Sequence, residues 1–227
     1  MPEPHPLVYQ TRFAMPSLMT QKRRPSSARW LAEHANDPYV QEARRLGLRS
    51  RAAFKLKEIH EKDRILKPGQ IVVDLGAAPG GWSQVARPLL GGRGQLFALD
   101  ILPFDPIPGV DILVGDFRED AVLHQLEARV GDQMVDLVLS DMAPNISGVE
   151  TTDQTASMYL CELALEFAKA HLKPRGTLLV KAFQGDGFEA YVKAMRASFE
   201  TVTIRKPKAS RPRSSEVYLL ARNFHAV

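Results

Sequence analysis

The chain has 227 residues, of which 44% are hydrophobic and 25% are charged, so it is long enough for one medium domain and is not wholly disordered. No apolar run reaches 18 residues and the N-terminus lacks a signal-peptide pattern, so neither a transmembrane helix nor membrane association is expected. One cysteine excludes an internal disulfide and fits a reducing compartment, so we expect a cytoplasmic protein.

The net charge of +4 is unevenly distributed along the chain. Residues 1–55 hold ten Lys or Arg against four Asp or Glu, and residues 193–222 hold eight against two. The stretch between them, 56–192, holds twelve against twenty, so two basic ends flank an acidic body. A polyanionic partner that touches both ends explains this pattern, but so do two solvated surfaces, and charge alone leaves both open.

The N-terminal part divides into two expected segments. Residues 1–20 show no helical or strand period and are expected to be a disordered lead, with Met15 and Met19 as alternative starts. Residues 21–56 are expected to form a basic helical extension, in which Ser50 caps a second helix. Residues 57–227 are then the main domain.

Short apolar runs alternate with helical stretches through most of the main domain. This pattern predicts βαβ units and a parallel sheet covered on both faces, as in a doubly wound α/β fold. The predicted strands are 71–75, 95–100, 111–114, 135–140 and 176–181, and the predicted helices are 82–90, 119–130, 153–172 and 187–199.

The C-terminal end of the chain breaks the alternation. Segments 199–205 and 217–222 read as two strands joined only by the basic loop KPKASRPRSS, with no helix between them. This arrangement predicts an antiparallel excursion at the edge of the sheet. Ligands of such folds bind at the carboxyl ends of the strands, near the point where strand order reverses.

The strongest local motif is IVVDLGAAPGGWSQVA, which reads as a strand, a glycine-rich turn and a helix start. Gly76, Gly80 and Gly81 allow the backbone to approach a ligand closely. The motif is neither a P-loop nor a dinucleotide fingerprint, because Trp82 stands where a P-loop has lysine and Pro79 does not suit a pyrophosphate nest. A nucleotide without phosphates therefore fits better.

Two acidic residues at later strand ends extend this interpretation. Asp100 closes the second strand, where a carboxylate can accept bonds from ribose hydroxyls, and Asp116 follows the third, where it can take an adenine amino group. An adenosine that carries a sulfonium in place of phosphates is S-adenosylmethionine. The alternative is a glycine turn that only shapes a strand–helix corner.

Four further polar residues lie at the ends of predicted strands or on the early helix. Asp141 follows the fourth strand, Lys181 ends the fifth, Glu216 opens the last strand and Lys55 lies on the early helix. Taken alone, Lys181 is a snorkelling side chain, Glu216 an edge-strand carboxylate and Lys55 a solvated helix residue.

Taken together, the motifs resemble the FtsJ/RrmJ (RlmE) family of ribosomal RNA 2′-O-ribose methyltransferases. The resemblance runs from about Ser26 to Arg222 and rests on SARWLAEH, GLRSRAAFKL, VVDLGAAPGGWSQ, DILPFDPI, VGDFRED, LSDMAPNISG, VKAFQGDGF and SSEVYLL. It implies a Rossmann-like class I methyltransferase fold with a mostly parallel seven-stranded sheet and an antiparallel edge strand. The implied activity is methylation of a uridine ribose in 23S rRNA, within the large ribosomal subunit, by a monomer.

The resemblance also implies roles for individual residues. It carries over a catalytic Lys-Asp-Lys-Glu set, and the family's S-adenosylmethionine contacts map onto a second set that shares Asp141. The catalytic set is Lys55, Asp141, Lys181 and Glu216, and the cofactor set is Gly80, Trp82, Asp100, Asp116 and Asp141.

Other functions were weighed against this interpretation. A ribose methyltransferase for transfer RNA or messenger RNA caps and a non-catalytic ribosome-assembly factor remain alternatives. A nicotinamide dehydrogenase would need a phosphate nest, which the glycine-rich turn does not offer. Cys161 and the pair Phe183 and Phe188 favour core packing over catalysis or base stacking, and the scattered histidines predict no metal site. The basic residues expected to bind RNA are Lys22, Arg23, Arg24, Arg29, Arg44, Arg45, Arg49, Arg51, Lys206, Lys208, Arg211 and Arg213.

Overall fold

The computed structural model describes residues 36–145 and 147–225. The chain divides into two units, Met1–Asn36 and Asp37–Val227, and the second carries every described helix and strand. The expected lead and the first basic residues, Lys22 to Arg29, lie outside the described residues. The elements are α2 (Pro38–Arg45), α3 (Ala52–Asp63), β1 (Ile71–Leu75), α4 (Gly81–Leu89), β2 (Gln95–Asp100), β3 (Asp111–Val114), α5 (Asp120–Val130), β4 (Val135–Ser140), α6 (Glu150–His171), β5 (Leu172–Phe183), α7 (Phe188–Ser198), β6 (Phe199–Arg205) and β7 (Glu216–Phe224).

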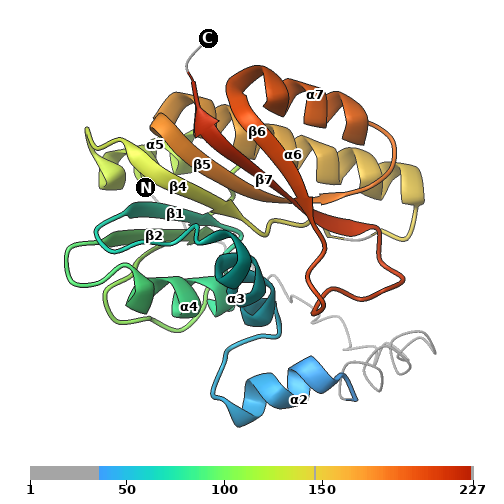
Figure 1. Ribbon diagram of the computed structural model, residues 1–227, viewed down its shortest axis with the longest axis horizontal. Helices are drawn as coiled ribbons and strands as arrows, with labels where there is room; N and C mark the ends of the chain where they lie inside the picture. The colour runs from blue at the N-terminus through green and yellow to red at the C-terminus, as the bar shows by residue number, and fades with distance from the viewer. Residues whose placement is uncertain (1–35, 146, 226–227) are drawn as a thin grey trace, which may run out of the picture. The chain divides into compact units, whose positions relative to one another are not determined.

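Seven strands form one sheet in the order β3-β2-β1-β4-β5-β7-β6 (Figure 1). The five strands from β3 to β5 are parallel, as their apolar runs and intervening helices predicted. Strand order reverses between β1 and β4, so the carboxyl ends of these two strands form the crevice where ligands of such sheets bind.

The predicted antiparallel pairing near the edge of the sheet is confirmed. The strand that runs antiparallel to its neighbours is β7. β7 lies between β5 and β6 and pairs antiparallel with both. Its register places Tyr218 opposite Lys181 and Glu216 opposite Phe183. A return through a loop without a helix brings the amino end of β7 beside the carboxyl end of β5, which is where the sequence places Glu216.

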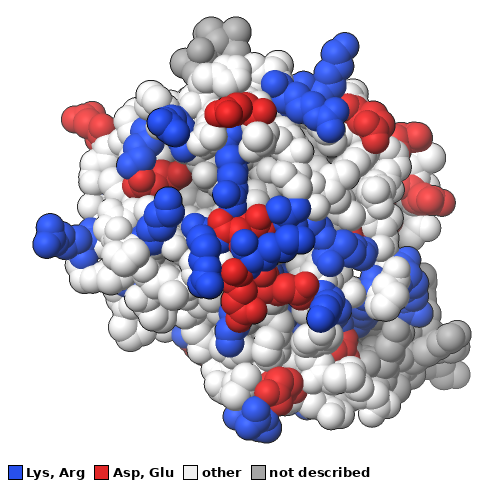
Figure 2. Space-filling view, viewed as in Figure 1, with Lys and Arg blue, Asp and Glu red and all other residues white. Residues whose placement is uncertain are grey.

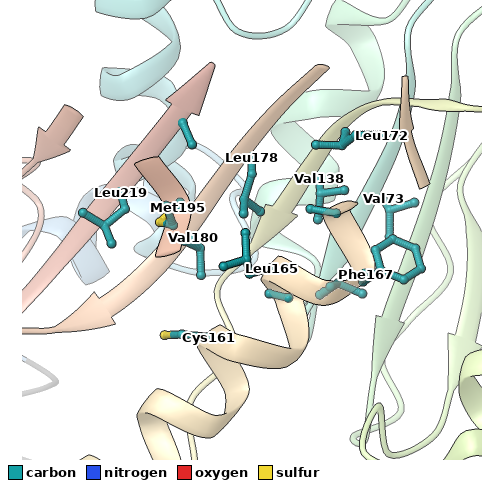
Figure 3. Close-up of a cluster of buried hydrophobic side chains, with 14 of the residues drawn as sticks. Val73, Val138, Cys161, Leu165, Phe167, Leu172, Leu178, Val180, Met195 and Leu219 are labelled. Carbon is teal, nitrogen blue, oxygen red and sulfur yellow. The ribbon is translucent and has the colours of Figure 1, made fainter. Parts of the chain in front are cut away.

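Helices cover both faces of the sheet (Figure 1). On one face, Leu56 and Ile59 of α3 pack with Trp82 of α4. On the other face, α5, α6 and α7 supply a larger cluster, part of which is shown in Figure 3. Cys161 belongs to that cluster, and burial raises the pKa of its thiol to about 12, so its interpretation as a core residue is confirmed. Phe188 is likewise buried in the core.

The predicted helix cap at Ser50 is wrong. Arg51 occupies the position before α3 and has helical backbone angles, and no side chain caps this helix. The Ser50 hydroxyl is buried without a hydrogen-bond partner. It packs so closely on Gly81 that a Cβ built there would meet the Ser50 Oγ at 2.3 Å, so tertiary packing with α4 decides its orientation.

Candidate active site

The turn after β1 places backbone, not side chains, at the switch point. Gly76 has a φ of +77°, and a Cβ at this position would lie 2.7 Å from the backbone nitrogen of Met142, in the segment after β4. Glycine is required because the two chain segments approach too closely for any side chain. The turn after β1 and the segment after β4 therefore lie against each other at the switch point, where a ligand is expected to bind.

The start of α4 is the second backbone element of the site. Gly80 precedes the helix with a φ of +98°, a conformation that favours glycine. The first-turn amides of a helix have no partner inside the helix and attract anionic groups. Trp82 itself is only 2% exposed, and its indole Nε1 donates to the carbonyl oxygen of Ala52 at 2.9 Å. Trp82 can thus reach a ligand through its backbone amide, because its ring is part of the core.

Asp100 and Asp116 lie at the ends of neighbouring strands, as predicted, but have different surroundings. Asp100 accepts backbone N–H bonds from Ala78 and Leu102, each at 2.8 Å, which fixes its carboxylate beside the glycine turn. Asp116 is paired with the Arg118 guanidinium at 2.6 Å, which lowers the pKa of this carboxyl. A ligand amino group would therefore share Asp116 with Arg118.

A buried carboxyl that sequence analysis did not single out lies beneath the turn. Asp74 of β1 is fully buried and accepts from the Ser83 hydroxyl at 2.6 Å, while its Oδ1 has no partner. The pKa of Asp74 is raised to about 7. Burial is the largest cause, the Ser83 hydrogen bond opposes it, and the nearby carboxylates of Asp141 and Asp100 add to the rise. A carboxyl inside an otherwise apolar strand, IVVDL, is the sequence signal that could have identified it.

Lys181 and Asp141 are in direct contact. The Lys181 ammonium, 8% exposed, donates to the backbone oxygen of Asp141 at 2.6 Å and lies 3.1 Å from its Oδ1. The Tyr218 hydroxyl donates to the same Oδ1 at 2.9 Å. Burial, followed by the neighbouring charges of Asp141 and Glu216, raises the pKa of Tyr218 well above its usual value, so this group stays a hydrogen-bond donor.

Lys55 and Glu216 form the second half of the predicted catalytic set. Their ion pair spans 2.7 Å, and the Ser210 hydroxyl donates to Glu216 at the same distance. Burial raises the pKa of Glu216, but Lys55 and Ser210 outweigh it, and the pKa lies below its ordinary value. The ammonium of Lys55 also lies 5.5 Å from the centre of the Tyr218 ring, so Tyr218 contacts both pairs.

The structure thus brings together all four predicted catalytic residues. Strand alternation puts Lys181, Glu216 and Tyr218 on the sheet face covered by α3, which carries Lys55. Tyr218 was not predicted as a link, although its period-two spacing from Glu216 in the sequence placed the two residues on one face. Asp116 has no contact with this set among the described residues.

Several basic residues expected to bind RNA have structural partners. Arg49 donates to the backbone oxygens of Pro79 and Pro106, at 3.2 and 2.8 Å. Arg51 pairs with Asp37 and donates to Ala209, and both side chains of that pair are largely buried. The Lys206 ammonium donates to the backbone oxygen of Ser214, and Arg45 pairs with Glu42. Lys208 donates to Glu58 only through its backbone N–H, and Arg44 is exposed. The guanidinium groups of Arg49 and Arg51 thus already hold loops of the site, and no observation tests their predicted binding to RNA.

Within residues 36–145 and 147–225, no group of three His, Cys, Asp or Glu side chains is placed to hold a metal ion. No helix in these ranges combines the length and apolar character needed to cross a membrane.

The positions of these groups define the class of protein. A helix start and the three carboxylates of Asp74, Asp100 and Asp141 converge where strand order reverses, beside a buried lysine. The fold and site are those of a Rossmann-like α/β domain of the class I methyltransferase type. A model of the FtsJ-like methyltransferase family matches residues 48–224, and the chain belongs to that family.

Relatives and solved structures agree with this assignment. The chain is 63% identical to Ribosomal RNA large subunit methyltransferase E of Azoarcus sp. (strain BH72), over 88% of this chain and 97% of that protein. It is 57% identical to the protein of the same name from Chromobacterium violaceum, over 88% and 98%. A ribosomal RNA methyltransferase structure from Plasmodium falciparum matches with a TM-score of 0.70 and 30% identity, over 79% of this chain and all of that one.

Proposed function

We propose that this chain uses S-adenosylmethionine to methylate the ribose 2′-OH of a uridine in 23S rRNA, within the large ribosomal subunit. The single observation that carries the chemistry is the buried Lys181 ammonium, which Asp141 holds at the carboxyl end of β5. The substrate class is supported by the two relatives at 57% and 63% identity, both named as large-subunit ribosomal RNA methyltransferases. We further propose that the protein acts as a monomer in the cytoplasm.

The donor set fits S-adenosylmethionine. A sulfonium and an amino group suit a crevice that holds the carboxylates of Asp141 and Asp100. The cofactor's own carboxylate suits the first-turn amides of α4, including that of Trp82. Asp100 would accept from the ribose hydroxyls, and Asp116 from the adenine amino group. When bound, the cofactor supplies an electrophilic methyl group.

The chain's residues then act on the acceptor hydroxyl. The acceptor oxygen would take the methyl group that the cofactor supplies, and it would give up its hydroxyl proton to a base of this chain or to water. Asp141 holds the Lys181 ammonium through its backbone oxygen and its carboxylate, which orients the lysine side chain. Lys55, Glu216 and Tyr218 fix the neighbouring wall, so positioning of the hydroxyl supplies part of the rate.

Lys181 can act at that oxygen in two ways. Our proposal is that it accepts the hydroxyl proton, which requires a neutral amine at the moment of transfer. The competing role is a charged ammonium that stabilises a developing alkoxide. A pH–rate profile separates them, because only the first role requires that the ionisation of Lys181 control the rate.

The experiment that tests the function is methyl transfer from labelled S-adenosylmethionine. Isolated large ribosomal subunits, free 23S rRNA, transfer RNA and capped RNA are offered in parallel, and the modified nucleotide is then mapped. Transfer to a uridine ribose of 23S rRNA is the expected result. Transfer only to transfer RNA or cap would overturn the substrate, and cofactor binding without transfer would favour an assembly factor. No observation favours these alternatives.

A further inference from the structure

A second polar cavity lies at the end of the sheet opposite the proposed active site. It has a volume of about 480 Å³ and is formed where β1, β4 and β5 begin and β7 ends. Six residues carry the argument that follows: Arg64, Lys67, Lys173, Arg175, Arg222 and Asn223. Arg175 and Lys181 are six residues apart on the same strand, so the cavity is roughly 20 Å from the active site.

Positive charge dominates the lining. Five of the lining residues are Lys or Arg, and Asp136 is the one acidic side chain among them. The carboxylate of Asp136 is already occupied, because it pairs with Lys173 and accepts from the backbone N–H of Ile71 at 2.8 Å. The cavity therefore presents an excess of cations to whatever enters it.

Three of those cations have no internal counter-charge. Arg222 is paired with Asp63 at 3.5 Å, from outside the cavity lining. Arg64, Lys67 and Arg175 are exposed, and no acidic side chain pairs with any of them within the described residues. The cavity differs in this respect from the middle of the face shown in Figure 2, where basic and acidic side chains are interspersed.

The backbone of the cavity is unusual. Among the described residues, three that are not glycine have positive φ angles: Arg64 at 52°, Arg175 at 68° and Asn223 at 57°. All three line this cavity. Glycine or asparagine adopts this conformation at lower cost than arginine, so two arginines are held where their backbone is unfavourable. Such outliers gather at functional sites, where the side chain has a use that outweighs the strain.

We propose that this cavity binds backbone phosphates of the RNA substrate, as a second contact away from the methylated nucleotide. The inference rests on the proposed function, in which the substrate is a large RNA. Guanidinium groups bind phosphate oxygens through paired N–H bonds, and two unpaired arginines are available here. Apart from Ile65 and Pro68 the lining offers little apolar surface, so a nucleobase has little to pack against. The open cavity suits a polymer whose chain continues on both sides.

The test uses the full chain and a double variant, Arg64→Asn with Arg175→Asn. Asparagine tolerates positive φ, so the charges are removed without new backbone strain. The matched control is Lys193→Gln with Arg196→Gln, two exposed residues of α7 outside the cavity. Affinity for a 23S rRNA transcript is measured by filter binding between 50 and 200 mM salt, alongside melting temperature and methyl transfer to large subunits.

We expect three results together. The slope of log affinity against log salt should become shallower by about 1.4–1.8 in the cavity variant, since each phosphate contact accounts for about 0.7–0.9. Its melting temperature should be unchanged or higher, and its cofactor affinity should match the wild type. The control should keep the wild-type slope. An unchanged slope in the cavity variant, or an equal change in the control, overturns the proposal. If the wild type binds the transcript but transfers no methyl group to ribosomal RNA, the proposed function fails instead.

Discussion

Lys181 and Asp141 lie 40 residues apart in the chain, yet the Lys181 Nζ is 2.6 Å from the backbone oxygen of Asp141 and 3.1 Å from its carboxylate. The contact exists because β4 and β5 are parallel neighbours whose carboxyl ends lie together. Both oxygens belong to Asp141, so this residue fixes the position of the lysine nitrogen. Asp141 is thereby shared between the lysine and the predicted cofactor site.

Replacing Lys181 with alanine should separate chemistry from cofactor binding. Methyl transfer should fall by about 10²–10⁴, the usual contribution of a positioned acid or base, because the group acting on the hydroxyl is lost. Cofactor affinity, measured by calorimetric titration, should stay close to that of the wild type. Single-turnover methylation at a near wild-type rate would show that the catalytic assignment is wrong.

Replacing Asp100 with alanine should have the opposite effect. The carboxylate is held by the amides of Ala78 and Leu102 and is predicted to accept from the cofactor ribose. Its loss should weaken S-adenosylmethionine binding by roughly 1.5–3 kcal/mol, the range for a hydrogen bond to a charged group. Calorimetric titration checks this value. Wild-type affinity would remove Asp100 from the cofactor site.

The stability of the fold should depend on the protonation of Asp74. Its folded pKa is raised to about 7, so the native state keeps a proton that the unfolded chain releases near pH ~3.9. The unfolding free energy should therefore fall as the pH rises from about 4 to about 7, and level off above that. Urea unfolding at several pH values should show a smaller fall for Asp74→Asn. An identical pH profile in the variant would contradict the raised pKa.

Glu216 should give the unfolding free energy the opposite pH dependence to that expected from Asp74. Its pKa is lowered in the folded state despite burial, because Lys55 and Ser210 stabilise the charged form. The contribution is fully present above the unfolded value of about 4.3 and is lost as the pH falls through the folded pKa. Glu216→Gln should remove part of this acid sensitivity in a denaturation series, whereas Asp132→Asn, at an exposed loop position, should leave it intact. Equal profiles for the two variants would argue against the Lys55–Glu216 pair.

Arg51 should behave as a structural residue and not as an RNA contact. Arg51→Met leaves the Asp37 carboxylate and the Ala209 oxygen without their guanidinium partner. We expect a loss of roughly 1–3 kcal/mol in unfolding free energy, the cost of unsatisfied polar groups. The salt dependence of RNA binding should keep its wild-type slope. A stable variant with a shallower slope would return Arg51 to the RNA-binding surface.

Local sequence patterns predicted the order of the elements. They also predicted which edge of the sheet carries the site. Apolar runs separated by helices predicted the parallel sheet, and the glycine turn with Asp100 and Asp116 predicted a nucleotide site at the strand ends. These features are readable because strand burial, turns and strand ends depend on neighbouring residues in the chain. The roles of Lys55 and Lys181 came from family resemblance, since each residue alone had an ordinary explanation.

Only the tertiary structure decided which side chains meet and which basic residues are already paired. Tyr218 connects the two lysine–carboxylate pairs because the antiparallel register of β7 sets it opposite Lys181. Arg49 and Arg51 looked like free cations in the sequence, but distant backbone oxygens bind them. The same holds for the second cavity, where two arginines more than 100 residues apart are brought together by sheet topology. Contacts across the sheet depend on strand order and register, which short-range sequence patterns do not encode.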